Sequence, residues 1–280
     1  MSKALESGAD AVILDLEDSV PIANKADARV LVAQTIAGMA AAVVGGSRPA
    51  IFVRVNGTAT GLLADDLAAV VRPGLDAVLL PKTESVEEVR SLAAALERHE
   101  AAAGMKRGAV EIILQIESAL GVYRGFDLIK ASPRVASVTI GIARDGDLQT
   151  DLGCGWSIEG PELLYARSKV LLDARAAGIV QPLDGVFSDL SDEDGLIRDS
   201  RLSARLGYVG RTVIHPKQIA PVRQAYAVPK EEVAYYQRVV TEFEAGERAG
   251  TAAITVNGKM VDYAMYQRAR RVLALAKLDG

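Results

Sequence analysis

The sequence predicts a parallel α/β fold of the TIM (β/α)8-barrel type, on the strength of three observations. Seven apolar runs of β-branched residues and leucine alternate along the chain with alanine-rich stretches of helical periodicity. Each apolar run is nearly continuous and ends in polar residues, as expected for parallel strands that are covered on both faces. The length of 280 residues also suits one such barrel, because these barrels commonly have about 250 residues.

The candidate strands are short and are bounded by polar and turn-forming residues. They are expected within Ala9–Asp18, Arg48–Gly57, Leu75–Ser85, Ala109–Ser118, Ser137–Gly146, Ile179–Asp189 and Gly210–Gln218. A closed barrel needs eight strands. We therefore expect either that the first strand is lacking, with a gap between the strands of Leu14 and Ile214, or that the fold is not a closed barrel.

Helices are expected before and between the strands, where apolar residues recur at helical spacing. After the tail of a first helix in Met1–Ser7, they are Lys25–Ala42, Leu62–Val71, Val86–Ala103, Leu120–Ile129, Pro161–Ala177 and Asp194–Leu206. Gly178 and Gly207 stand where a helix C-terminus needs a left-handed residue, and Pro133 should end the helix before it. Such alternation implies right-handed βαβ units and a parallel sheet.

A different pattern follows the last strand. The elements expected there are a helix, a hairpin and a final helix, at Val228–Gly246, Thr251–Val261 and Asp262–Leu278. Asn257-Gly258 is a favoured two-residue turn, and Asp262 is a suitable N-cap. We therefore divide the chain into a barrel domain of residues 1–225 and a C-terminal extension of residues 226–280, which would serve as a lid or an oligomer contact.

Composition excludes several classes of protein. Half of the residues are apolar, and the formal net charge is −4 without a basic block, which argues against a nucleic-acid-binding protein. The single cysteine, Cys154, excludes an internal disulfide and favours a reducing compartment. Because the chain has no apolar run of about 18 residues and no signal-peptide pattern, we expect a cytoplasmic protein without a membrane segment.

Charged and polar side chains gather at the predicted carboxyl ends of the strands, where parallel barrels carry their active sites. These ends supply Asp15, Glu17, Asp18, Arg54, Asn56, Lys82, Glu117, Asp147, Asp189 and His215. Acids outnumber bases, and no cysteine or histidine cluster is present, which fits a hard divalent cation with oxygen ligands, Mg²⁺ before Zn²⁺. Since Glu117 and Asp147 each follow a buried strand, we predict that these two hold one metal ion.

Each candidate also has a structural interpretation. Glu117 could interact with a helix dipole, Asp147 could cap a helix, and Arg54 could form an ion pair with the acidic loop. The acids around Glu17 could form a solvated loop, but three acids crowd one strand end, so we expect at least one of them in the site. His215 precedes a proline and could be a structural histidine.

Taken in order, several motifs resemble the citrate lyase beta-subunit-like branch of the HpcH/HpaI aldolase family. They are GADAVILDLEDSV, FVRVNG, LPKTES, the glutamate of QIESALGV, DLQTDLG, TVIHPKQI and, near the C-terminus, NGKMVD. The resemblance runs from Ser7 to about Ala276, and the order and spacing of the motifs are specific. It implies a (β/α)8 barrel with a C-terminal helical extension, commonly assembled as a homotrimer.

The resemblance also implies a chemistry. Members of the family cleave or form a carbon–carbon bond in a 3-hydroxyacyl thioester, such as malyl-, citramalyl- or citryl-CoA, giving acetyl-CoA and a 2-keto acid. The resemblance implies Mg²⁺ held by Glu117 and Asp147, and an arginine, Arg54, that clamps a carboxylate or stabilises an oxygen that gains charge. Asp262 matches the aspartate that acts as a base in a neighbouring subunit's site; its alternative role is the N-cap.

The complete set of candidate site residues follows from these two lines of argument. We predict Arg54, Asp262 and Glu17 as catalytic residues, and Arg54, Lys82, Asn56 and His215 as substrate-binding residues.

Two departures from the family pattern leave alternatives open. The strand that usually precedes the GADAV segment is absent, and Gly146 stands where a glutamate is common, so Asp145 is a rival of Asp147 as the metal ligand. The other functions that we consider are a malyl-CoA thioesterase, a class II pyruvate aldolase acting without CoA, and a non-catalytic barrel subunit.

Overall fold

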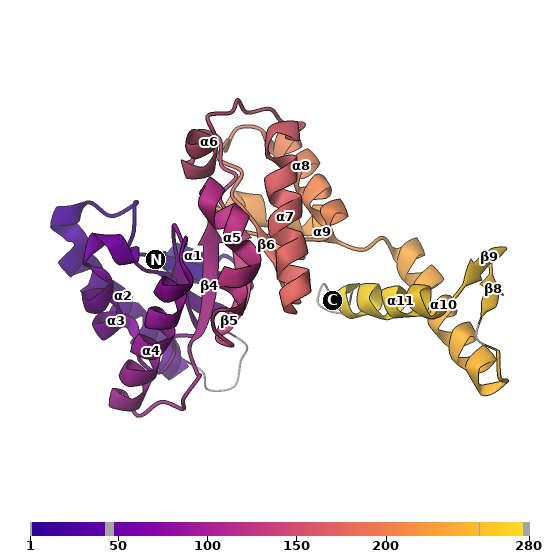
Figure 1. Cartoon of the computed structure of the whole chain (residues 1–280), viewed down its shortest axis with the longest axis horizontal. Coiled ribbons are helices and arrows are strands. Elements are labelled where there is room, and N and C mark those ends of the chain that lie inside the picture. Colours follow the sequence, from indigo (N-terminus) through magenta and orange to yellow (C-terminus); the bar gives the residue numbers. More distant parts are fainter. Residues whose placement is uncertain (1, 43–47, 252, 277–280) are drawn as a thin grey trace. The chain divides into compact units, whose positions relative to one another are not determined.

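The computed structural model describes residues 2–42, 48–251 and 253–276. The chain forms two compact units, Met1–Val222 and Arg223–Gly280. The first unit contains one large sheet and the helices between its strands, and the second contains two helices and a hairpin (Figure 1).

Seven parallel strands form the sheet, and its strand order follows the chain, so each strand pairs with the next. They are β1 (Ala11–Asp15), β2 (Ala50–Arg54), β3 (Ala77–Leu80), β4 (Glu111–Ile116), β5 (Val135–Ile140), β6 (Leu183–Asp184) and β7 (Gly210–Arg211). Six lie within the predicted segments, and β5 begins at Val135, ahead of its segment. Among the described residues no pairing joins β7 to β1, so the sheet is open. The prediction of seven parallel strands is confirmed.

The helices of the first unit are α1 (Ser2–Leu5), α2 (Lys25–Ala42), α3 (Leu63–Val70), α4 (Val86–Ala102), α5 (Ala119–Lys130), α6 (Asp147–Leu152), α7 (Pro161–Ala177) and α8 (Glu193–Leu206), and α9 (Ile219–Tyr226) spans the boundary between the two units. Ser85 and Glu88 form a capping box at the start of α4. Left-handed Gly178 and Gly207 end α7 and α8 as predicted. The sequence did not predict α6 or α9, which are short and lack an extended periodic pattern. Figure 1 shows α5 and α7 side by side.

Strand register decides which side chains share one face of the sheet. Ala77 and Leu79 of β3 and Ile113 of β4 form one buried cluster, against which Phe52 of β2 packs. Because side chains alternate along a strand, residues two positions further on point to the same side. Arg54 lies two residues beyond Phe52, so it continues this face toward the carboxyl ends of the strands.

Buried ion pairs connect the two shortest strands to the neighbouring helices. Arg167 of α7 donates hydrogen bonds to Asp184 of β6 and to Asp199 of α8. The second oxygen of Asp199 lies 2.7 Å from Nη1 of Arg211 in β7. These four side chains are buried and carry two charges of each sign. They connect β6 and β7 to the helices, where the strands themselves contribute few ladder bonds.

A second ion pair lies at the amino ends of the strands. Glu100, in the last turn of α4, is fully buried and accepts one hydrogen bond from each terminal nitrogen of Arg134, both 2.7 Å long. It also accepts the backbone N–H groups of Gly108 and Val110. One carboxylate therefore connects α4 with the chain entering β4 and β5.

The second unit has its own core. It consists of α10 (Lys230–Arg248), β8 (Ile254–Val256), β9 (Lys259–Val261) and α11 (Tyr263–Ala276). Buried residues from all four elements pack together, with Phe243 stacked on Tyr266 at a centroid distance of 4.8 Å. Asn257 and Gly258 both have positive φ, which confirms the predicted turn. The predicted end of the last helix, Leu278, lies outside the described residues.

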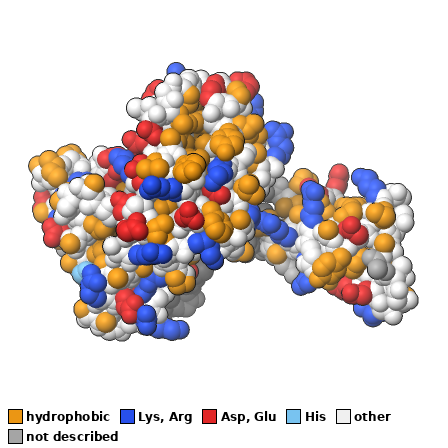
Figure 2. Space-filling view, viewed as in Figure 1, with side chains coloured by type: hydrophobic (Ala, Val, Ile, Leu, Met, Phe, Trp, Pro, Cys, Tyr) orange, Lys and Arg blue, Asp and Glu red, His pale blue; other side chains and the backbone are white. Residues whose placement is uncertain are grey.

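The surface carries charges of both signs. On the face drawn in Figure 2, acidic and basic side chains are interspersed. In the part of the chain that the structure describes, no helix is both long and apolar enough to cross a membrane.

Replacing Glu100 by glutamine should lower the free energy of unfolding by about 3–5 kcal/mol, because Arg134 would stay buried without its carboxylate. Burial alone would raise the pKa of Glu100, but the hydrogen bonds from Arg134 and the backbone lower it to about 2 from 4.5. The pair should therefore stabilise the fold above pH 4.5 and lose this effect as the pH falls toward 2. Urea unfolding at several pH values measures both effects.

Glu97→Gln is the matched control, because the Glu97 side chain is 45% exposed and pairs with Arg107 at the surface. It should change the free energy of unfolding by no more than about 0.5 kcal/mol. Equal effects of the two substitutions would contradict the structural role of Glu100.

Candidate active site

An ion pair between the first two strands orients Arg54. Asp15 and Arg54 end β1 and β2 and are register partners. Nε and Nη2 of Arg54 donate to the two carboxylate oxygens of Asp15 at 2.8 and 2.6 Å, and Nη1 lies 3.2 Å from Oε2 of Glu17. Burial alone would raise the pKa of Asp15, but the hydrogen bond and charge of Arg54 lower it to about 2. Arg54 therefore stays charged, with one edge held by Asp15 and Nη1 turned toward other acids.

The loop after β1 and the loop after β3 meet through Lys82. Its Nζ lies 2.8 Å from Oδ2 of Asp18, 3.1 Å from Oε1 of the buried Glu17, and 3.9 Å from Oδ2 of Asp147. Burial would lower the pKa of Lys82, but hydrogen bonds to Asp18 and Glu17 raise it, so the ammonium is charged. The other oxygen of Glu17, Oε2, is buried and accepts no hydrogen bond from the described residues.

Glu117 follows β4 and is held by two donors. The backbone N–H of Lys82 donates to Oε1 at 2.9 Å, and Nε2 of Gln115 donates to Oε2 at 2.5 Å. Burial is the largest influence on Glu117 and raises its pKa; the charges of Asp147 and Glu17 act in the same direction, against the two hydrogen bonds. The two hydrogen bonds therefore hold the Glu117 carboxylate in place, and a cation bound beside it would lower its pKa.

Two features place Asp147 rather than Asp145 beside Glu117. Asp147 is the first residue of α6, with Gly146 as the N-cap, and its charge acts on both Glu117 and Lys82. The Asp145 side chain is 85% exposed and lies near Arg144. Asp147 thus belongs to the cluster, and capping does not explain its presence.

A glycine at the end of β5 leaves room for this arrangement. A Cβ atom on Gly141 would come within 2.6 Å of Cβ of Glu117, closer than two carbon atoms can approach. The chain after β5 can therefore pass beside Glu117 only without a side chain at this position.

Asn56 lies next to the cluster, but its side chain is engaged in the interior. Nδ2 donates to the carbonyl of Leu16 and to Asp66, and Oδ1 accepts a hydrogen bond from Nζ of Lys25. Lys25 also donates to the carbonyl oxygens of Leu16 and Glu17. Asn56 and Lys25 therefore hold the acidic loop through hydrogen bonds in the interior. A direct contact of Asn56 with substrate stays a prediction.

Three other strand-end or catalytic candidates make local hydrogen bonds. His215 is exposed, and its Nδ1 accepts the backbone N–H of Lys217 as the cap of a short 3-10 helix. Asp189 is exposed and accepts hydrogen bonds from Ser191. Asp262 belongs to the second unit, where its side chain accepts the N–H of Met265 at the start of α11. The substrate role of His215 and the catalytic role of Asp262 therefore stay predictions.

The sequence analysis did not identify Gln115, Lys25 or Asp66. Gln115 stands two residues before Glu117, so strand alternation alone could have placed both on one face. Lys25 and Asp66 lie on helices that approach the loop only in the folded chain, and no spacing in the sequence indicates their contacts.

The cluster suits a divalent cation. It contains five carboxylates and two cations, an excess of three negative charges, supplied by Asp15, Glu17, Asp18, Glu117 and Asp147 against Arg54 and Lys82. Within the described residues no three acidic, histidine or cysteine side chains are grouped to hold a metal. Mg²⁺ commonly takes only one or two protein carboxylates and completes its shell with water and substrate. Two carboxylates, Glu117 and Asp147, therefore fit a Mg²⁺ site.

Comparisons with known proteins give consistent results. The family described as HpcH/HpaI aldolase/citrate lyase matches residues 1–216, and one described as a C–C bond lyase of the TIM-barrel fold matches residues 154–280. Citrate lyase subunit beta of Leuconostoc mesenteroides subsp. cremoris is 37% identical over 273 residues, which cover 97% of this chain and 87% of the relative. The mitochondrial citramalyl-CoA lyase of Mus musculus is 29% identical, over 95% of this chain and 79% of the relative.

A solved structure resembles the whole chain. The protein CitE from Mycobacterium tuberculosis, in complex with magnesium, acetoacetate and coenzyme A, has a TM-score of 0.72 and 31% sequence identity. The match covers 99% of this chain and 93% of that chain. The predicted TIM-barrel fold class is confirmed.

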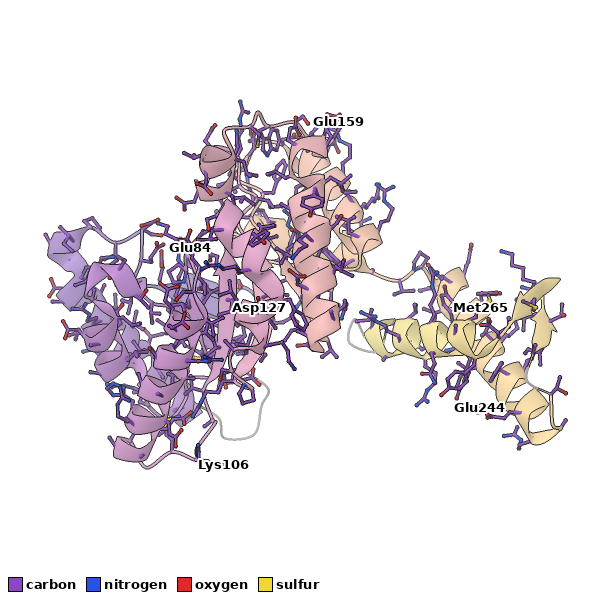
Figure 3. The ribbon with its side chains drawn as sticks, in the orientation of Figure 1. Glu84, Lys106, Asp127, Glu159, Glu244 and Met265 are labelled. Atoms are coloured by element: carbon purple, nitrogen blue, oxygen red, sulfur yellow. The ribbon has the colours of Figure 1, made fainter. Side chains whose placement is uncertain are left out.

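Replacing Asp15 by asparagine should release one edge of Arg54 and lower the free energy of unfolding by about 1.5–3 kcal/mol, since a hydrogen bond between charged groups is lost. Asp127→Asn in α5, labelled in Figure 3, is an exposed control that should have little effect. Urea unfolding followed by circular dichroism measures the difference. An Asp15→Asn variant as stable as the wild type would show that Asp15 does not hold Arg54.

Proposed function

The chain belongs to the HpcH/HpaI aldolase/citrate lyase family of carbon–carbon lyases, and we propose that it is a magnesium-dependent enzyme acting on a 3-hydroxyacyl-CoA thioester. Malyl-, citramalyl- and citryl-CoA are the substrates of this kind that we consider. The reaction joins or separates acetyl-CoA and a 2-keto acid. A homotrimer is part of the proposal, because the resemblance assigns Asp262 to a neighbouring subunit's site.

The observation that carries the proposal is the meeting of three side chains at the carboxyl ends of the strands. Buried Glu117 and half-exposed Asp147 form the anionic part. The charge of Glu117 acts on Arg54, whose Nη1 lies 3.2 Å from Oε2 of Glu17. This combination suits a substrate fragment with a carboxylate and a neighbouring oxygen, which are the groups of a 2-keto acid. The magnesium and coenzyme A bound to the Mycobacterium tuberculosis relative support the same assignment.

In this proposal, Glu117 and Asp147 hold Mg²⁺, which supplies a Lewis acid for the oxygens of the keto-acid fragment. The residues around it supply the rest of the chemistry. Gln115 and the N–H of Lys82 keep the Glu117 carboxylate in one orientation. Arg54, held along one edge by Asp15, directs Nη1 at an oxygen of the substrate and lowers the cost of its negative charge.

Cleavage requires two proton transfers. The hydroxyl proton of the substrate passes to Oε2 of Glu17, a buried oxygen that lies 3.2 Å from Nη1 of Arg54. The bond between the carbinol carbon and the methylene carbon breaks, and its electron pair forms the enolate of the thioester. The carboxylic acid of Asp262 then donates a proton to the methylene carbon, which becomes the methyl group of acetyl-CoA. Condensation follows the same steps in reverse.

The activity test uses the full chain with Mg²⁺, acetyl-CoA and, separately, glyoxylate, pyruvate and oxaloacetate. We expect an acyl-CoA adduct with one of these keto acids, detected by mass spectrometry, and its cleavage when the purified adduct is supplied. Adduct formation without CoA would indicate an aldolase, and release of free CoA without keto acid would indicate a thioesterase. No turnover in either direction, with bound Mg²⁺ verified, would refute the lyase assignment.

Glu117→Gln should reduce turnover at least about 100-fold, because the variant keeps the shape of the side chain but loses the charge that binds a cation. Glu111→Gln, at the opposite end of the same strand, is the matched control and should retain wild-type turnover. Full activity of Glu117→Gln in EDTA-treated buffer would exclude a metal-binding role for this residue.

Asp262 can be tested with a pair of substitutions that separates its two roles. Asn is as good an N-cap as Asp, so Asp262→Asn should keep the stability of α11 and still lose turnover if the carboxylate moves the proton. Asp262→Ala should lose turnover and also about 1 kcal/mol of stability. Wild-type turnover in Asp262→Asn would restrict Asp262 to its capping role.

A further inference from the structure

The ammonium of Lys82 joins acids from two separate segments of the cluster. Its Nζ lies within 3.9 Å of Glu17 and Asp18, which follow β1, and of Asp147, which follows β5. Lys82 itself follows β3. The shortest of these distances is 2.8 Å, to Asp18. The ammonium therefore lies among the same carboxylates that give the cluster its excess of negative charge.

The backbone of Lys82 has a separate task. Its N–H donates to Oε1 of Glu117 at 2.9 Å, and its φ of 50° lies in the left-handed region. A residue with a side chain is disfavoured there, whereas glycine adopts this φ freely. The N–H contact therefore needs only the backbone, and a glycine would supply it with less strain. The lysine side chain must act through its charge.

A fixed positive charge beside a cation site has two opposite effects. Without a metal ion, it neutralises part of the acidic excess and keeps the loops after β1 and β5 together. When a divalent cation binds, the like charge of the ammonium opposes it, because both attract the same carboxylates. Side chains of Lys82 and Asp147 are about half exposed, at 43% and 53%, so water and salt weaken the repulsion without abolishing it.

We propose that Lys82 is a built-in counter-cation of the cluster: its ammonium competes with the divalent cation for Glu17, Asp18 and Asp147, while its N–H positions Glu117. Lys82 thus keeps metal affinity below what the carboxylates alone would give. This inference rests on the metal site of the proposed function. It assigns Lys82 a role in addition to the contact with substrate that the sequence predicts.

The test measures binding of Mn²⁺ by electron paramagnetic resonance, with Mg²⁺ added as a competitor, at about pH 8, where ordinary carboxylates are ionised. Lys82→Gln removes the charge and keeps a polar side chain, and Lys82→Gly removes the side chain but keeps the N–H and suits the left-handed φ. Both should bind metal about ten-fold more tightly than the wild type at low salt, with a smaller difference at high salt. Lys82→Arg should restore wild-type affinity.

Lys106→Gln is the matched control for the change of charge. Lys106 is exposed and precedes β4, at the amino ends of the strands. Figure 3 shows it at the lower end of the first unit, away from Glu84, which follows Lys82 in the chain. The Lys106→Gln variant should bind metal with the same affinity as the wild type. It therefore separates a general effect of net charge from a local effect of Lys82.

The outcomes distinguish this inference from the proposed function. If wild-type protein binds metal and the folded Gln and Gly variants bind it equally or more weakly, the inference fails while the metal site stands. If the wild type binds no metal and Glu117→Gln is indistinguishable from it, the metal site of the proposed function fails together with the inference. Circular dichroism of each variant verifies folding, and Lys82→Gly provides the result if Lys82→Gln does not fold.

Discussion

The parallel register of the strands is the constraint on which the whole acidic cluster depends. Because β1 and β2 end level with each other, Asp15 meets Arg54 directly. The chain beyond β3 and β4 then brings Lys82 to Glu117. A buried charge is costly unless an opposite charge or a hydrogen-bond donor meets it. Each member of the cluster therefore depends on a residue that follows or ends another strand, and a shift of one strand would leave several charges without partners.

The two ends of the sheet balance their charges differently. At the amino ends, Glu100 accepts four hydrogen bonds, two of them from Arg134, whose charge is equal and opposite. At the carboxyl ends, acids exceed cations and burial raises the pKa of Glu117. Oε2 of Glu17 is buried with only the ion pair to Arg54, at 3.2 Å, among the described residues. The paired charges at the amino ends thus stabilise the fold. The carboxyl ends keep an excess of negative charge, which a cation and a substrate can balance.

The sequence predicted most of the residues of the candidate site, but it did not predict the contacts between them. Arg54, Lys82, Glu117 and Asp147 were all found from one rule, that polar residues directly after apolar strands share one edge of a parallel sheet. The same rule also selected His215, which caps a short 3-10 helix, and Asp189, which accepts hydrogen bonds from Ser191. It missed Lys25, whose ammonium reaches the carbonyl oxygens of the acidic loop from a helix. The position of a residue along a strand can be inferred from the sequence around it. The contacts between a helix and a distant loop cannot be inferred in this way.

The sequence by itself determined the alternation of seven strands with helices, the turn of the C-terminal hairpin and the residues at the strand ends, because hydrophobic periodicity and turn chemistry are local properties. Only the tertiary structure decided which of these residues act together. The ion pair of Asp15 with Arg54 confirmed the structural interpretation of the arginine, whereas its contact with substrate stays a prediction. The charge of Asp147 acts on Glu117, and the Asp145 side chain is 85% exposed, so Asp147 remains the preferred candidate for the metal ligand. These outcomes depend on distances between separate strands and on burial, which arise only when the sheet has formed.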